Sequence, residues 1–146
     1  MKISDDRLFH IRAVAEYMFK HAFIYDQNPN QMYLLGFLHD IGYICGDENH
    51  EKNGAKLLGE DNRFSKIIAA HGMTPQEYMG TNGITESEIP KELILLWEAD
   101  MVVNSHGAHA GFQERLKDVG ERYGQDSREY KACKEKIEWL KNRKGK

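Results

Sequence analysis

Apolar residues recur every three or four positions along much of the chain, which is the spacing of amphipathic α-helices. The first run predicts a helix over residues 5–23, capped by Ser4 or Asp5. Its two stripes are Leu8, Ile11, Ala15, Met18 and Ala22, and His10, Val14, Tyr17 and His21. His10 is therefore on a semi-buried face. His21 follows on the same stripe, about 16 Å further along the axis, and we expect it to be structural.

Further helices are predicted between turn signals rich in Gly, Pro, Asn and Asp. These helices are expected over residues 31–40, 48–58, 64–70, about 90–104 and 112–123. A last helix is expected to follow a cap at Asp126 or Ser127. Residues 42–47 and 73–86 are expected to be loops, and Thr85 to Glu88 resembles a capping box. We therefore predict a compact all-α domain of six or seven helices that spans residues 1–146.

The predicted helix over residues 31–40 ends in an apolar run followed by His39 and Asp40, and Gly42 comes two residues later. A buried ionised carboxylate is costly unless it is paired or binds a metal. Imidazole and carboxylate together form a good ligand set for first-row transition metals. The alternative is a helix C-terminus, where histidine suits the dipole and glycine ends the helix. The pair alone leaves both interpretations open.

Three more positions have the same ambiguity. His50 lies in the first turn of a predicted helix, where local sequence alone favours an exposed residue. His71 follows an apolar run and precedes a glycine, which also fits a histidine on a helix dipole. Asp100 shares a helix face with Leu93, Leu96, Trp97 and Val103. It therefore points toward the core, where a buried salt bridge to an arginine is the alternative to a metal.

Six nitrogen or oxygen ligands thus sit at helix ends or on core-facing stripes: His10, His39, Asp40, His50, His71 and Asp100. Six residues placed in this way are hard to explain by packing. Neutral imidazoles and carboxylates suit Fe, Mn, Co, Ni or Zn, so we predict one or two divalent transition metal ions. His106 and His109 also have ligand spacing, but a Gly-rich loop is poorly pre-organised, and we expect both at the surface.

Charge and composition narrow the class of protein. The chain has 146 residues and a formal net charge of −3; residues 131–146 hold seven Lys/Arg against two Glu, a net +5, which leaves −8 on residues 1–130. An acidic body makes nucleic acid an unfavoured partner. We expect the basic end to be the solvated face and frayed end of the last helix. The alternatives are contact with RNA or an acidic partner, and contact with a second subunit of a homodimer.

No apolar run approaches the ~20 residues that span a membrane, and the first residues show no apolar signal region. Two cysteines are too few for a disulfide framework. A reduced, cytoplasmic protein is therefore the expectation.

The pattern resembles the HD-domain metal-dependent phosphohydrolase superfamily. Its core motif of a first His, an adjacent His-Asp pair and a late Asp would be His10, His39, Asp40 and Asp100. Subfamilies with two metals add two histidines between the pair and the late Asp, and His50 and His71 match those. The resemblance spans roughly residues 7–104. It is specific for the superfamily and not for a substrate.

The resemblance implies that His10, His39, Asp40 and Asp100 hold a first metal, and that Asp40 bridges to a second metal held by His50 and His71. It implies hydrolysis of a phosphate ester or anhydride by a metal-bound water, with Asp40, His50 and His71 as catalytic residues. A small nucleotide is the favoured substrate. The alternative is a non-catalytic module that binds a metal and a nucleotide, as a sensor or partner; a di-iron oxygenase is a weaker interpretation.

One position departs from the family pattern. Many two-metal members read His-Asp-x-Gly-Lys, where the lysine is expected to help bind phosphate, and here that position is Tyr43. A phenol can donate a hydrogen bond but carries no cation. The residues that could supply the charge are Lys52, Lys56, Arg63 and Arg115. The missing lysine is the best support for the non-catalytic alternative, and the six retained ligands argue against it.

Overall fold

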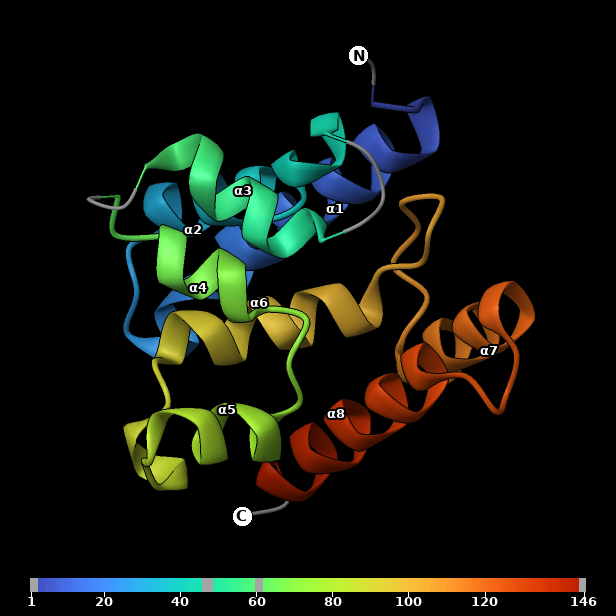
Figure 1. The fold of residues 1–146 in the computed structure, drawn as a ribbon. Coiled ribbons are helices and arrows are strands. Elements are labelled where there is room, and N and C mark those ends of the chain that lie inside the picture. Colours follow the sequence, from blue (N-terminus) through green and yellow to red (C-terminus); the bar gives the residue numbers. More distant parts are fainter. Residues whose placement is uncertain (1–2, 46–48, 60–61, 145–146) are drawn as a thin grey trace.

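The computed structural model in Figure 1 is an all-α protein, as predicted. The structure describes residues 3–45, 49–59 and 62–144, and within them it forms eight α-helices and no strand beyond one isolated bridge. The elements are α1 (Asp5–His21), η1 (Ala22–Tyr25), α2 (Pro29–Leu38), η2 (Ile41–Cys45), α3 (His50–Leu58), α4 (Ser65–Ala70), α5 (Pro75–Asn82), η3 (Glu86–Glu88), α6 (Lys91–Val102), α7 (Phe112–Tyr123) and α8 (Arg128–Lys144). Residues 46–48, where the third helix was predicted to begin, lie outside the described residues.

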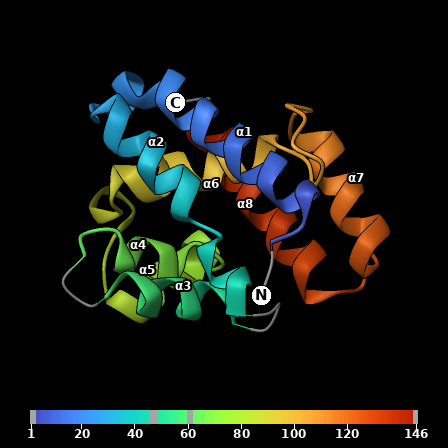
Figure 2. The ribbon, with the colours of Figure 1, turned by 90° about the horizontal axis from the view of Figure 1, so that it is seen from above.

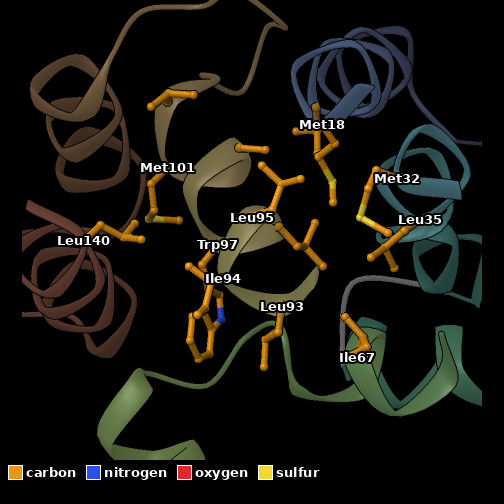
Figure 3. Packing of buried hydrophobic residues seen from close by; sticks show 14 of the residues in the cluster. Met18, Met32, Leu35, Ile67, Leu93, Ile94, Leu95, Trp97, Met101 and Leu140 are labelled. Atoms are coloured by element: carbon orange, nitrogen blue, oxygen red, sulfur yellow. The ribbon is translucent and has the colours of Figure 1, made fainter. Parts of the chain in front are cut away.

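Helix α6 is the centre of the fold. Seven consecutive residues of this helix, 93–99, are buried, and a helix that is buried all round has neighbours on every side. It contacts α1 and α2 on one side and α7 and α8 on the other. Figure 3 shows Met18, Met32 and Leu35 on the first side, and Met101 beside Leu140 of α8 on the second.

Helices α1 and α2 pack closely because one of them carries a glycine at the contact. A Cβ at Gly36 would lie only 2.7 Å from the Cα of Ala15. This approach places the end of α2, and with it His39, next to the middle of α1. The predicted apolar stripe of α1 is buried except for Leu8, which is 39% exposed.

The prediction of a loop over residues 73–86 is wrong, because α5 forms there. The amide of Glu77 donates to Thr74 Oγ1 (3.2 Å), and the amide of Thr74 donates to Glu77 Oε1 (3.3 Å). This capping box satisfies two amides at the start of the helix. The similar pair Thr85 and Glu88 caps the short η3 instead of α6. The additional helix explains why eight α-helices are described where six or seven were expected.

Helices α7 and α8 form a hairpin that packs on α6 (Figure 2). Ser127 caps α8, since its Oγ accepts from the amide of Tyr130 at 3.1 Å. Cys133, Ile137 and Leu140 recur at helical spacing along α8, and all three are buried. Among the described residues, no helix combines the length and apolar character that a membrane span requires.

Candidate metal centre

The six predicted ligands meet in one place, although they come from five separate parts of the chain. His10 lies on α1, His39 and Asp40 directly follow α2, His50 begins α3, His71 follows α4, and Asp100 lies near the end of α6. Five of them line a cavity of about 170 Å³, and His39 lies fully buried beside it. Residues up to 90 positions apart in sequence are thus in direct contact.

The carboxylate of Asp40 lies at the middle of this cluster, and its two oxygens face different histidines. Oδ2 lies 3.2 Å from His39 Nε2 and 3.8 Å from His10 Nε2. Oδ1 lies 3.3 Å from both His50 Nε2 and His71 Nε2. The single buried carboxylate therefore joins two sets of nitrogen atoms.

Three overlapping groups of side chains have ligand atoms within 4.8 Å of one another: His10, His39 and Asp100; His39, Asp40 and His71; and His50, Glu51 and His71. In the first group, Asp100 Oδ1 lies 2.8 Å from His10 Nε2 and 3.6 Å from His39 Nε2. Glu51 was not predicted. Its Oε1 lies 3.3 Å from His50 Nδ1, on the side of that ring away from Asp40.

Backbone carbonyls orient three of the four histidines. Nδ1 of His10 donates to Asn104 O (2.9 Å), Nδ1 of His39 to Gly36 O (2.6 Å), and Nδ1 of His71 to Ile68 O (2.5 Å). A carbonyl oxygen only accepts, so each Nδ1 carries the hydrogen. In the neutral ring the lone pair is then on Nε2, and each Nε2 points toward the carboxylates. Histidines that ligate metals are oriented by this kind of outer hydrogen bond.

The environment of His39 favours a cation at this centre. Its Nε2 is buried and has no hydrogen-bond partner among the described residues, although two carboxylates lie nearby. Burial by itself lowers the pKa of His39, but the charges of Asp40 and Asp100 outweigh it and raise that pKa to about 10. Burial opposes ionisation of Asp40 too, yet His39 holds its pKa well below the usual range. The site therefore attracts positive charge, and its nitrogen and oxygen donors fit a transition metal ion.

A close approach at Gly42 places the ligands of α3. A Cβ on this residue would lie 1.7 Å from the His50 carbonyl oxygen and 2.6 Å from the Gly54 nitrogen. Only glycine lets η2 lie this close to the first turn of α3. Because Asp40 directly precedes η2, the same contact holds His50 against Asp40. Gly42 thus does more than end a helix, which was the simpler interpretation of its position.

The comparison with protein families agrees with this geometry. The family model described as HD domain matches residues 7–105, roughly two thirds of the chain. The chain belongs to the HD domain family. The resemblance to the metal-dependent phosphohydrolase superfamily is thereby confirmed. Comparison with curated proteins and with solved structures gives no match. All six metal-ligand candidates lie inside the HD domain match, whereas α7 and α8 lie outside it.

Two of the five residues considered for substrate binding line the cavity of the HD domain. Tyr43 stacks on the ring of His50, with 4.1 Å between the ring centroids and 17° between the planes. Arg115 of α7 places Nη2 4.0 Å from Asp100 Oδ1, and its Nη1 donates to Asp118 Oδ2 at 3.2 Å.

The other three lie elsewhere. Lys52 is exposed on α3 and lines a neighbouring cavity of about 430 Å³. Lys56, one turn further along α3, is also exposed. Arg63 pairs with Glu92 at 3.5 Å, away from the residues that line the HD centre.

Two cations that the sequence interpretation missed also line this cavity. Arg7 lies one turn before His10 on α1, and Lys136 comes from α8. Lys136 is buried, and its Nζ donates to the carbonyl of His71 at 3.0 Å. A signal for both existed in the sequence, because residues three apart on a helix share a face. Arg7 lies three residues before His10 on α1, and Lys136 lies three residues after the buried Cys133 on α8.

The remaining histidines of the HD protein lie away from the metal centre. His106 and His109 are exposed, and His106 Nδ1 lies 3.3 Å from Asp6 Oδ2. His21 bonds through Nδ1 to the carbonyl of Tyr17 at 2.8 Å. These positions agree with the surface and structural roles that the sequence indicated.

Proposed function

We propose that this HD-domain protein is a metal-dependent phosphohydrolase that cleaves a phosphate ester or anhydride. The observation that carries the proposal is the position of Asp40. Its Oδ2 faces His39 and its Oδ1 faces His50, each within 3.3 Å. A carboxylate that bridges two cations needs two separate sets of partners of this kind.

The chain supplies a ligand set for each cation. His10, His39 and Asp100 would hold one ion, His50 and His71 would hold the other, and Asp40 would contact both. When bound, such ions lower the pKa of a water molecule and stabilise negative charge on the oxygens around phosphorus. The hydrogen bonds from Nδ1 to the backbone keep the rings of His10, His39 and His71 in position.

Other residues of the cavity would balance the charge of the substrate. Arg115 brings fixed positive charge to its wall, and Lys136 adds an amine whose pKa is lowered by burial; both come from helices outside the HD match. Cys133 is also part of this wall, but burial raises the pKa of its thiol to about 11. It therefore stays protonated at neutral pH and is a poor nucleophile. Hydrolysis at this site uses water, and no covalent step on the chain is needed.

The volume of the cavity limits which part of a substrate can fit at the metal centre. The cavity of about 170 Å³ is small for a whole nucleotide, but a second cavity of about 390 Å³ adjoins it and shares Arg7 with it. A phosphoryl group would occupy the smaller cavity, and the rest of the substrate would extend into the larger one. We propose a nucleotide as the first substrate class to test. A cytoplasmic location, the absence of nucleic acid as a partner and homodimer formation through the basic α8 remain predictions.

The metal assignment is tested first by elemental analysis. The wild-type protein should contain about two transition metal ions per chain, and a His50→Ala variant about one. His106→Ala is the matched control, because it also removes a histidine side chain but lies on the exposed loop. Equal metal content in wild-type protein and His50→Ala would contradict the assignment of His50.

The reaction is tested with metal-loaded protein and a panel of nucleotides and phosphate esters. Turnover by the wild-type protein, lost together with metal in Asp40→Ala, supports the hydrolase. Full activity of Asp40→Ala would refute the proposed centre. Metal-dependent nucleotide binding without turnover of any panel member would favour the non-catalytic alternative.

A further inference from the structure

The ring of Tyr43 lies between two other flat groups at the edge of the metal centre. The imidazole of His50 stacks on it, 4.1 Å from its centroid and nearly parallel. The guanidinium carbon of Arg7 lies 3.6 Å from the centroid of the same ring. This distance is well inside the ~6 Å range of a cation–π contact. The first turn of α1, η2 and the start of α3 thus meet in one stack.

The guanidinium of Arg7 has hydrogen-bond donors to spare. Its Nη1 lies 3.7 Å from Asp40 Oδ2, which is an ion-pair distance but too long for a hydrogen bond. Within the part of the chain that the structure describes, no side-chain hydrogen bond of Arg7 is formed. The other two cations of the cavity are engaged, Arg115 by Asp118 at 3.2 Å and Lys136 by a carbonyl at 3.0 Å.

Arg7 also stands where a substrate would pass. It lines the cavity of about 170 Å³ that holds the metal-ligand candidates, and it lines the adjoining cavity of about 390 Å³. Its side chain is 22% exposed, compared with 5% for Asp40. A group bound at the metal centre and extending into the larger cavity would therefore lie alongside the guanidinium.

We propose that Arg7, held flat on the ring of Tyr43, is the cation that binds the phosphoryl group of the substrate. Arg7 is then a substrate-binding residue, and Tyr43 is a positioning residue that acts through it. The ligand class is a phosphate ester or anhydride, which rests on the proposed function. A planar guanidinium suits phosphate because two of its N–H groups can donate to two oxygens at once.

The proposal explains the tyrosine at the position where many two-metal HD proteins have a lysine. A lysine there would bring its own charge and would repel a neighbouring guanidinium. An aromatic ring instead attracts the guanidinium to its face. In this chain residue 7 therefore supplies the positive charge that residue 43 supplies in those proteins, and the aromatic ring at residue 43 holds the Arg7 guanidinium in position.

The first test measures the binding of orthophosphate to metal-loaded protein by titration calorimetry. Arg7→Ala should weaken binding about 10- to 100-fold, the range that corresponds to loss of hydrogen bonds to a charged group. Arg12→Ala is the matched control, since Arg12 is exposed on the same helix, and its affinity should equal that of wild type. Metal content is measured in every variant and should not change.

Variants at residue 43 test whether Tyr43 positions Arg7 or contacts the phosphate itself. Tyr43→Phe keeps the ring and should bind phosphate within about twofold of wild type, whereas Tyr43→Leu should weaken binding, because the guanidinium loses its support. In the Arg7→Ala background, Tyr43→Lys should restore most of the lost affinity. A residue that only maintained the fold would not be rescued by a charge at a different position.

The same variants are assayed with p-nitrophenyl phosphate, where Arg7→Ala should raise KM more than it lowers kcat. Orthophosphate affinity equal to wild type in Arg7→Ala, or no binding by wild type, would overturn the role of Arg7 even if hydrolysis is observed. Weaker binding in Arg7→Ala together with rescue by Tyr43→Lys, but no hydrolysis by any variant, would support Arg7 and refute the hydrolase.

Discussion

Replacing Gly42 with alanine should displace the first turn of α3 and remove one metal ion. The new Cβ would lie 1.7 Å from the carbonyl oxygen of His50. A carbon–oxygen contact needs at least about 3.3 Å, so the two segments must separate by about 1.6 Å. All three atoms nearest the Cβ are backbone atoms, His50 O, His50 C and Gly54 N, so no side chain can rotate away to relieve the contact.

The metal centre cannot absorb such a shift, because ligand distances in metal sites hold to within about 0.2 Å. His50 should leave Asp40, and the ion held by His50 and His71 should be lost. The set formed by His10, His39 and Asp100 does not include α3 and should keep its ion. Overpacking of this kind also costs about 1–3 kcal/mol of stability.

The assay is elemental analysis of the purified variant, combined with urea unfolding. Gly80→Ala is the matched control, since a Cβ there meets nothing within 4 Å. It lies in α5, where alanine should stabilise the helix by roughly 0.5–1 kcal/mol. If Gly42→Ala retains two ions and wild-type stability, the close approach at Gly42 does not position His50, and the reasoning is wrong.

Two further predictions concern buried charge. Burial opposes protonation of His39, but Asp40 and Asp100 raise its pKa from 6.5 to about 10. In chelator-treated protein the stability that His39 contributes should therefore be fully present below about pH 6.5 and should be lost as the pH rises from there toward 10. A melting temperature that stays constant across this range would contradict that charge balance. Glu98 is buried and accepts hydrogen bonds from Tyr17 (2.5 Å) and Tyr25 (3.0 Å). Glu98→Leu should lower the free energy of unfolding by about 1–3 kcal/mol without changing metal content, and urea unfolding at wild-type stability would exclude this role.

Several features of the fold could be predicted because their causes are local. The helix over residues 112–123 has the predicted bounds, because the apolar spacing that forms it and the glycine at 124 that ends it lie in one continuous segment. Ser127 caps the last helix for the same reason. The helix over residues 75–82 does not follow from the Pro and Gly signals around it, which favour a loop, although Thr74 and Glu77 form a local capping signal.

The cations of the site show where local reasoning fails. Arg63 and Lys52 lie in the sequence between the His-Asp pair and Asp100, yet neither lines the metal-centre cavity. Arg7 and Lys136 do line it. Side-chain spacing tells which residues share a helix face but not which faces meet. Lys136 reaches the carbonyl of His71 across 65 positions of sequence, and this contact depends on how α8 packs against α6.

The sequence by itself determined the all-α class, the six candidate ligands and the family, because helical periodicity and the order of the His and Asp residues are properties of the chain alone. Only the tertiary structure decided that the two oxygens of Asp40 face separate histidines and that Arg7 lies on Tyr43. These contacts join helix ends that are far apart in sequence. Their distances follow from the packing of α1 and α2 against α6 and of α3 against η2 and α4, and from glycines 36 and 42 that permit close approach.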